Sequence, residues 1–207
     1  GEKEQFFGGK RVQIERNTRV KARVKAHVLK ELIEGKERVV VMGHSIGDVD
    51  SFGACVGIYR IAKTLNRKAH IVVDEVNSSV IMERFYSKDY ESDLLIDGEE
   101  AKELVDESTL LVIVDVNKGS YTECPDLIDM AQSVVVIDHH RQAGDAITKA
   151  LLFYIEPYAS SACEMVAEIS QYIGNGLRLR PAEAEAMYAG IMIDTNYFTD
   201  KAGVRTF

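Results

Sequence analysis

The stretch RVVVMGHSIGDVDSFGA at residues 38–54 decides how the chain folds. Residues 38–42 form an apolar run without polar alternation after Arg38, which is typical of a strand buried on both faces of a parallel sheet. Gly43 and Gly47 bracket a turn, and the residues from about 50 onward have the apolar spacing of a helix. A buried strand, a turn and a helix in this order begin a βαβ unit.

Similar apolar runs recur along the chain. They occupy residues 69–73, 109–114, 133–137 and 151–155. Helical patterns separate or follow these runs, at residues 50–65, 77–87, 98–106, 124–131, 160–173 and 181–193. The alternation of strand and helix predicts an α/β fold, with an open, mainly parallel five-stranded sheet flanked by helices.

The N-terminal part has a different pattern. From Asn17 the apolar residues recur every four positions, as Val20, Val24, Val28 and Leu32. Leu29 and Ile33 flank them, and we expect this stripe to face a core. We assign residues 1–16 to the tail of a preceding domain or linker, residues 17–36 to a linker helix, and residues 37–207 to one domain.

Composition limits the possible functions. The chain has 207 residues and a formal net charge of -8, which argues against binding to duplex nucleic acid, because that needs a basic surface. Cys55, Cys124 and Cys163 form no C-x-x-C pair, so a reducing cytosol is expected. No apolar stretch approaches the roughly 18 residues that span a bilayer, so we expect this segment not to be inserted in a membrane.

Polar side chains follow three of the predicted strands. His44, Asp48 and Asp50 come after the first, Asp115 follows residues 109–114, and the triplet Asp138-His139-His140 ends residues 133–137. The carboxyl ends of parallel strands meet at one edge of a sheet, where ligands bind. Carboxylates and imidazoles without thiolates suit Mn²⁺, Mg²⁺ or Fe²⁺, and an Asp that bridges two ions would make a two-metal site for phosphoester hydrolysis.

Other readings of these residues stay open. Gly43-His44-Ser45-Ile46-Gly47 also fits the G-x-S-x-G elbow of a serine hydrolase, but such enzymes build several strands before the elbow, and nearby aspartates would oppose an oxyanion. Asp48 or Asp50 could cap the following helix. If the backbone is extended, His139 and His140 point to opposite sides, so at most one of them should bind the metals.

Four segments in order resemble the motifs of the DHH phosphoesterases, a superfamily of RecJ-type exonucleases, oligoribonucleases and family II inorganic pyrophosphatases. They are GHSIGDVDSFGA, VIVDVN, VVVIDHH and GIMIDT. The segments FFGGK, TRVKARVKAHVLKELI and GVRTF resemble, more narrowly, the membrane-anchored bacterial cyclic-di-AMP phosphodiesterases of the GdpP type. In those proteins a DHHA1 domain with a glycine-rich substrate-binding motif follows, which would lie beyond Phe207.

The resemblance implies a role for each matching residue. One metal would be bound by His44, Asp48 and Asp115, and the other by Asp50, Asp115, His139 and Asp194. His140 would contact the scissile phosphate or protonate the leaving oxygen, and Asp138 would orient ligands. Ser161 and Arg205 are candidate substrate-binding residues, although Ser161 and Glu164 also fit a capping box. Gly53, Ala54 and Gly57 would let the first helix approach the sheet closely.

The expected function is a metal-dependent phosphodiesterase that uses two divalent ions, Mn²⁺, to hydrolyse a cyclic dinucleotide, cyclic-di-AMP, to linear pApA. The resemblance places it at the cytoplasmic face, in a membrane-anchored parent protein that can form homodimers. A DHH nuclease acting on short RNA or single-stranded DNA is one alternative. A metal-dependent nucleotide sensor without catalysis is another.

Overall fold

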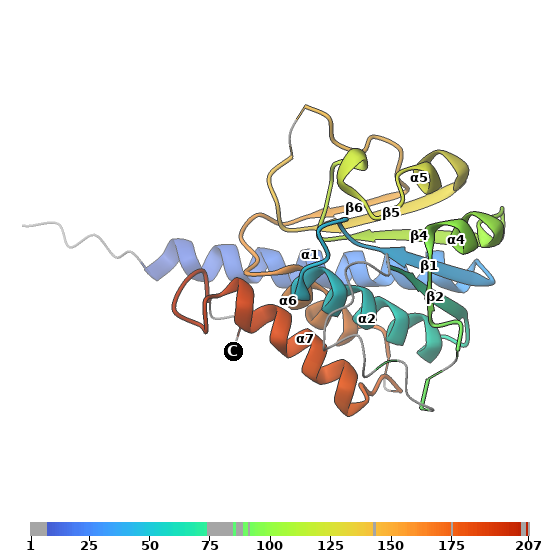
Figure 1. Cartoon of the computed structure of the whole chain (residues 1–207). Coiled ribbons are helices and arrows are strands. Elements are labelled where there is room, and N and C mark those ends of the chain that lie inside the picture. The colour runs from blue at the N-terminus through green and yellow to red at the C-terminus, as the bar shows by residue number, and fades with distance from the viewer. Residues whose placement is uncertain are drawn as a thin grey trace, which may run out of the picture.

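The computed structural model describes residues 8–73, 85, 89–90, 92–142, 144–174, 176–203 and 206, with side chains from residue 19 onward (Figure 1). Its helices are α1 (Gly8–Glu34), α2 (Val49–Thr64), α4 (Gly98–Leu104), η3 (Gly119–Tyr121, a 3-10 turn), α5 (Asp126–Met130), α6 (Ala162–Ser170) and α7 (Pro181–Asp194). Its strands are β1 (Arg38–Met42), β2 (Lys68–Val72), β3 (Leu95–Ile96), β4 (Thr109–Val114), β5 (Ser133–Asp138) and β6 (Leu152–Ile155). The predicted helix at residues 77–87 lies, apart from Phe85, outside the described residues.

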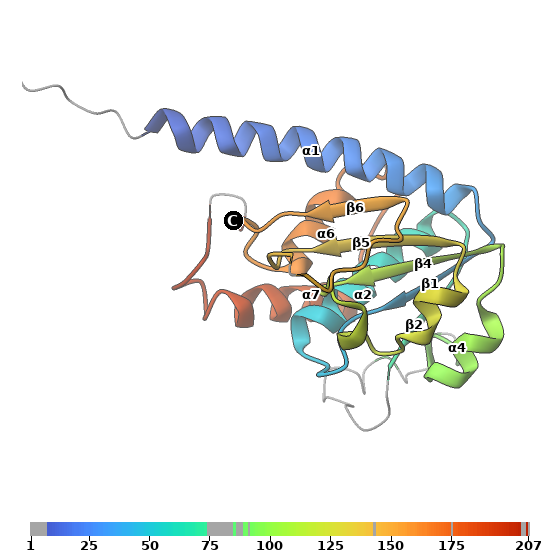
Figure 2. The ribbon, with the colours of Figure 1, turned by 90° about the horizontal axis from the view of Figure 1, so that it is seen from above.

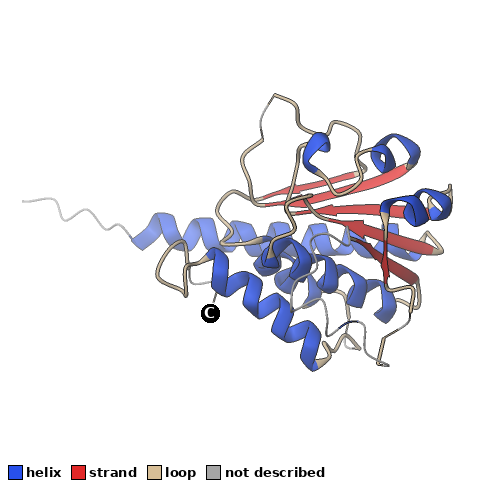
Figure 3. Ribbon diagram, viewed as in Figure 1, coloured by secondary structure: helices blue, strands red, loops and turns tan. Residues whose placement is uncertain are grey.

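The described strands form one parallel sheet in the order β3-β2-β1-β4-β5-β6 (Figure 3). The predicted α/β fold is therefore confirmed, with one strand more than expected. β3 was missed because a strand of two residues is too short to carry a hydrophobic pattern. The chain adds β2 and β3 on one side of β1 and then returns to add β4 on the other, so the strand order reverses between β1 and β4.

Helices cover both faces of the sheet. The helices α1, α2, α6 and α7 lie on one side, and α4 and α5 lie on the other (Figure 2). Successive residues of β1 point alternately into these two layers: Val39 and Val41 pack into the first core, and Val40 and Met42 pack into the second. Burial on both faces explains why the strands are continuously apolar rather than alternating.

Helix α1 begins at Gly8, so the predicted linker helix extends into the segment assigned to the preceding tail. The predicted contact stripe is right only in its second half. Val28 and Leu32 pack against the core, and the flanking Leu29 and Ile33 are buried in it. Val20 and Val24 are more than half exposed, and in this first half of the described side chains of α1 the fully buried residues are Ala22 and Ala26. Small alanines allow the helix to pack closely along α6 and β6, and close packing decided the helix orientation where the larger valines had suggested another face.

The glycines of α2 face helices, not the sheet as predicted. A Cβ added at Gly53 would lie 2.7 Å from the backbone oxygen of Ala186 in α7 and 2.7 Å from Cys163 Sγ in α6. One added at Gly57 would meet side-chain atoms of Val166 and Met187. The absence of side chains at both positions lets α2 approach α6 and α7 closely, and α7 ends at the candidate ligand Asp194.

We expect the Gly53→Ala variant to unfold more easily. The added methyl group would push against the Ala186 backbone oxygen, and overpacking costs about 1–3 kcal/mol, of which better helix propensity returns up to about 1 kcal/mol. Urea denaturation measures the loss. The control is Gly176→Ala, where no atom lies within 4 Å of the added carbon, and its stability should stay close to that of the wild type. Equal stability of Gly53→Ala and the wild type would contradict this packing.

Candidate metal centre

The candidate ligands lie at the carboxyl edge of the sheet, around the reversal of strand order. His44 follows β1, Asp115 follows β4, and His139 follows β5, and these three strands are neighbours. Asp194 is the last residue of α7. Topology therefore brings together residues that are far apart in the sequence.

The loop between β1 and α2 is tightly built. A Cβ on Gly43 would clash with Ser51 Oγ, so only glycine fits there. The His44 backbone N–H donates to Ser51 Oγ over 3.2 Å. Asp48 caps α2, because its Oδ1 accepts from the Ser51 amide at 2.8 Å, and its Oδ2 lies 3.3 Å from His44 Nε2. Asp48 thus has both the capping contact and the contact expected of a ligand.

Asp115 lies at the centre of the cluster. Its Oδ2 is 3.3 Å from His44 Nε2, and its Oδ1 is 3.3 Å from His139 Nε2. The residue has a φ of 61°, a left-handed conformation that Asp adopts more readily than most residues. The turn directs one oxygen toward each imidazole, which is the arrangement that a bridging carboxylate needs.

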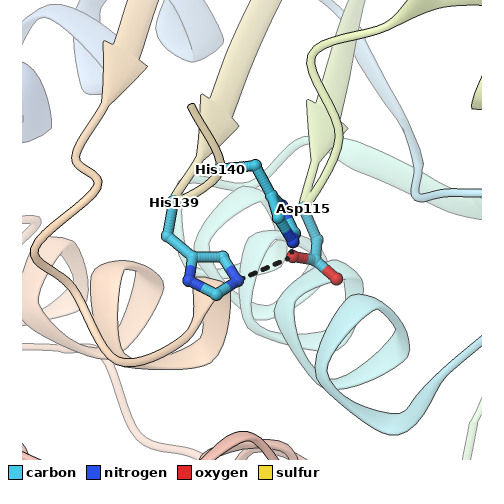
Figure 4. A group of neighbouring side chains, drawn as sticks. All are labelled: Asp115, His139 and His140. Atoms are coloured by element: carbon cyan, nitrogen blue, oxygen red, sulfur yellow. Dashed lines mark ion pairs between the residues drawn. The ribbon is translucent and has the colours of Figure 1, made fainter. Parts of the chain in front are cut away.

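His139 and His140 both reach toward Asp115 (Figure 4). Their ring centres are 4.4 Å apart, and His140 Nδ1 lies 3.6 Å from Asp115 Oδ1. Rings on opposite sides were expected only for an extended backbone, and this condition is not met, because β5 ends at Asp138 before the two histidines. That only one of them is a ligand stays a prediction.

A second group of possible metal ligands lies around Asp50, which is more buried than His44 and Asp48. His139 Nε2 is 3.4 Å from Asp194 Oδ2 and 4.0 Å from Asp50 Oδ2. Asp50 is 1% exposed and accepts backbone hydrogen bonds from Ala162 and Cys163, at the start of α6, over 2.6 and 2.9 Å. The helix start thereby fixes the orientation of Asp50 and favours its negative charge.

Asp138 is fully buried and orients His140. Its Oδ1 lies 2.8 Å from His140 Nδ1, and its Oδ2 accepts a hydrogen bond of 2.5 Å from Asn117 Nδ2. Asn117 also donates to the His140 backbone oxygen over 3.4 Å. The motif VIVDVN contains Asn117 but does not predict this contact, because nothing in the sequence indicates which side chains pair across two strands.

The cluster holds protons when no cation is present. Burial and repulsion from Asp115 raise the pKa of Asp50 to about 7, and burial also raises the pKa of Asp194. The Asp115 and Asp48 carboxylates raise the pKa of His44 to about 10. Burial lowers the pKa of His139, but contact with Asp115 and the charges of Asp50 and Asp194 outweigh it and raise that pKa to about 9.

These residues fit divalent metal ions. Asp115 Oδ1 and His139 Nε2 are buried atoms without a hydrogen-bond partner among the described residues, and they face each other across 3.3 Å. Such orphaned polar atoms are destabilising unless something binds them. The described residues offer three groups of possible ligands, which are Asp115, His139 and His140; His44, Asp48 and Asp115; and Asp50, His139 and Asp194. A cation would bind the orphaned atoms and neutralise the crowded carboxylates.

We expect the affinity of the chain for Mn²⁺ to rise with pH. With pKa values of about 10 and about 9, His44 and His139 are protonated at neutral pH, and a metal must displace these protons. Binding at pH 7 should release about two protons, and the dissociation constant should fall as the pH rises toward those values. Isothermal titration in buffers of different ionisation enthalpy measures the release.

The controls for this measurement are two histidine variants. His44→Ala should reduce the proton release by about one, and His27→Ala, an exposed histidine on α1 that pairs with Glu31, should leave it unchanged. Metal binding that releases no protons and does not depend on pH would argue that the imidazoles are not ligands.

Ser45 lacks the backbone of a nucleophile elbow. In that motif the serine lies on a strained turn that leads directly into a helix. Here Ser45 does not have a positive φ, and α2 begins at Val49, after the Asp48 cap. The geometry favours the metal site over the serine hydrolase.

The two candidate substrate-binding residues remain predictions. Ser161 is fully buried and caps α6, accepting from the Glu164 amide over 3.0 Å, so the structure gives it the capping role. Glu164 accepts from the Ser160 hydroxyl at 2.5 Å, where a capping box would turn it toward the Ser161 amide. Arg205 lies outside the described residues.

The cluster opens into a cavity of about 500 Å³. Besides His44, Asp48, Asp115, Asp138, His140 and Asp194, its lining consists of Ile46, Val116, Asn117, Lys118, Tyr121 and Arg141. None of this second set was predicted to contact substrate. The sequence could not identify these lining residues, because they lie on the loops after β1, β4 and β5, which come together only in the fold.

The fold and the cluster together define a class of protein: α/β domains that gather aspartates and histidines for divalent metal ions at the carboxyl edge of a parallel sheet. The sequence profile of the DHH family, N-terminal domain, matches residues 38–191. The chain belongs to this family, and the resemblance found in the sequence motifs is confirmed.

Two relatives match nearly the whole chain. Cyclic-di-AMP phosphodiesterase GdpP of Bacillus subtilis (strain 168) is 42% identical over 209 residues, which cover 99% of this chain and 32% of that protein. Cyclic-di-AMP phosphodiesterase PdeA of Listeria monocytogenes serotype 1/2a (strain 10403S) is 38% identical, with the same coverage of both chains. The chain spans about a third of the length of these relatives.

A solved structure has the same fold. The crystal structure of an exopolyphosphatase-related protein from Bacteroides fragilis matches with a TM-score of 0.73 at 21% identity, over 88% of this chain and 53% of that one. At this identity the likeness concerns the fold alone. Among the described helices, none has the length and hydropathy to cross a bilayer.

Proposed function

We propose that this domain hydrolyses phosphodiester bonds with two divalent metal ions. The observation that carries the proposal is the position of the Asp115 carboxylate between two histidines. One oxygen lies 3.3 Å from His44 Nε2, and the other lies 3.3 Å from His139 Nε2. A carboxylate shared in this way supports two ions close together, as two-metal phosphoesterases need. Imidazole and carboxylate ligands without a thiolate favour Mn²⁺ among the possible ions.

Two divalent ions bound here would supply the nucleophile and neutralise charge on the phosphate. His140 supplies the proton for the leaving oxygen in this proposal. The contact of His140 with Asp138 raises the pKa of His140, so the imidazole is protonated more readily. This contact is made by Nδ1, and Nε2 is therefore left to donate the proton to the leaving oxygen. Lys118 and Arg141 add positive charge to the cavity wall, where an anionic substrate would bind.

The proposed substrate is a cyclic dinucleotide, cyclic-di-AMP, and the product is linear pApA. The support is the similarity to GdpP and PdeA, whose names state this activity. In the parent protein we propose that residues 1–36 connect a preceding region to the domain at residues 37–207. A membrane anchor, a position at the cytoplasmic face and a homodimer also belong to this proposal, on the resemblance to GdpP-type proteins.

A panel of substrates tests the proposal. Cyclic-di-AMP, other cyclic dinucleotides, pyrophosphate and short RNAs would be incubated with the Mn²⁺-loaded protein, and the products separated by chromatography. Preferred turnover of cyclic-di-AMP to pApA is expected. Preferred turnover of short RNA would favour a DHH nuclease, and tight binding without turnover of any of these compounds would favour a nucleotide sensor.

A further inference from the structure

Two exposed apolar side chains border the cavity beside the metal cluster. Ile46 is 82% exposed and Tyr121 is 54% exposed, and both line the cavity. Exposed isoleucine and tyrosine side chains have no role in binding a metal ion at this cluster. Apolar and aromatic groups that line a cavity next to converging charged groups are typical of the part of a site that holds the organic portion of a ligand.

The backbone fixes these two side chains to the metal site. The Ser45 amide donates to the Tyr121 oxygen over 2.8 Å, and the Glu123 amide donates to the Gly43 oxygen over 3.0 Å. Between these bonds, the metal-ligand candidate His44 pairs with Thr122 in an antiparallel bridge. Ile46 and Tyr121 are therefore held on two paired loops, each within two residues of this bridge.

Lys118 braces the tyrosine ring. Its ammonium group lies 5.1 Å from the centre of the Tyr121 ring, at cation-π distance, and 3.5 Å from Asp145 Oδ1. Lys118 also forms a backbone bridge with Ala146. The lysine lies over the ring, and 54% of the tyrosine stays exposed at the cavity that it lines.

We propose that Tyr121 and Ile46 form a nucleobase rim, in which Tyr121 stacks on the base of the nucleotide whose phosphate lies at the metal cluster and Ile46 packs against that base. This inference rests on the proposed function, in which the substrate is a nucleotide. Aromatic stacking suits every base, because every base has a π face. The rim therefore supplies affinity for a nucleotide over a bare phosphate ester, and it places one base contact within this domain.

Binding of two small ligands tests the rim without catalysis. Adenosine 5'-monophosphate has a base and ribose 5-phosphate has none, so the ratio of their dissociation constants isolates the base contact. Titration calorimetry with the Mn²⁺-loaded chain should show the adenosine compound binding about tenfold more tightly. Tyr121→Ala should bring the ratio close to one, whereas Tyr121→Phe should preserve it and Ile46→Ala should reduce it.

The controls separate stacking from other effects. Tyr188→Ala removes a tyrosine on α7 with a similar exposed fraction of 57%, and its ratio should equal that of the wild type. Tyr121→Leu keeps an apolar side chain without the ring, so it should also lose the preference even if Tyr121→Ala is unstable. Equal binding of both ligands by the wild type overturns the inference. So does an equal loss for both ligands in Tyr121→Ala, which would indicate an effect on the metal site.

Hydrolysis assays keep this inference apart from the proposed function. A chain that prefers the adenosine compound but hydrolyses no phosphodiester would contradict the proposed function and leave the rim in place. A chain that hydrolyses cyclic-di-AMP yet shows no preference for the adenosine compound would support the function and contradict the rim.

Discussion

The His139→Ala variant should lose cyclic-di-AMP hydrolysis almost completely, with kcat/KM lower by on the order of a thousandfold. His139 Nε2 lies 3.3 Å from Asp115 Oδ1, 3.4 Å from Asp194 Oδ2 and 4.0 Å from Asp50 Oδ2, so this imidazole connects the central carboxylate to the deeper group. Its removal takes away a proposed metal ligand and leaves these carboxylates facing one another. Steady-state kinetics at saturating Mn²⁺ measure the effect.

The matched control is Ser45→Ala, which should keep kcat/KM within about threefold of the wild type. Ser45 lies in the same loop as His44, so the pair of variants compares the two signatures that overlap in GHSIG. Labelling of Ser45 by a fluorophosphonate with loss of activity, together with an active His139→Ala variant, would establish a serine hydrolase. Thermal denaturation of both variants shows whether each still folds.

The Asp115→Ala variant should bind fewer than one Mn²⁺ per chain where the wild type binds about two. This expectation rests on the position of Asp115, whose two oxygens face His44 and His139 separately. Metal analysis after Mn²⁺ loading and desalting gives the stoichiometry. Removal of a ligand that binds one ion would weaken the binding of that ion alone, whereas removal of the shared carboxylate should weaken the binding of both ions.

Two further variants separate metal loss from misfolding. Asp115→Asn keeps the size of the side chain and tolerates the φ of 61° at this position, so it should fold like the wild type and still lose metal. Asp129→Ala removes an exposed carboxylate of α5 and should keep both ions. A wild-type chain with a single ion, or an Asp115→Ala variant that retains two, would refute the bridging role.

The sequence predicted most of the layout of this site. Buried parallel strands have a strong signature, because continuous apolar runs are stable only when both faces are covered. Once the strands were recognised, the carboxyl-edge rule placed His44, Asp115 and His139 near one another. Asp194 came from the resemblance to the DHH motifs and not from the strand pattern, since it ends a helix.

The predictions that failed depended on packing. Val20 and Val24 are exposed while Ala22 and Ala26 are buried, so close approach to neighbouring elements decided which face of α1 is buried in this part of the helix. The resemblance to the DHH motifs implied a close approach of Gly53 and Gly57 to the sheet, but in the fold their partners are α6 and α7. Hydrophobic periodicity describes one segment at a time, and these contacts depend on the shapes of two.

The sequence by itself determined the fold class, the sheet edge that carries the site and the residue types available to bind metal, because these follow from local patterns and from the chemistry of side chains. The tertiary structure decided which side chains of the site contact one another. It turned both His139 and His140 toward Asp115, held Asp138 with Asn117, fixed Asp50 at the start of α6, and brought Ile46 and Tyr121 to the same cavity. Each of these contacts links segments separated along the chain or depends on where a strand ends, and only the folded backbone sets those distances and directions.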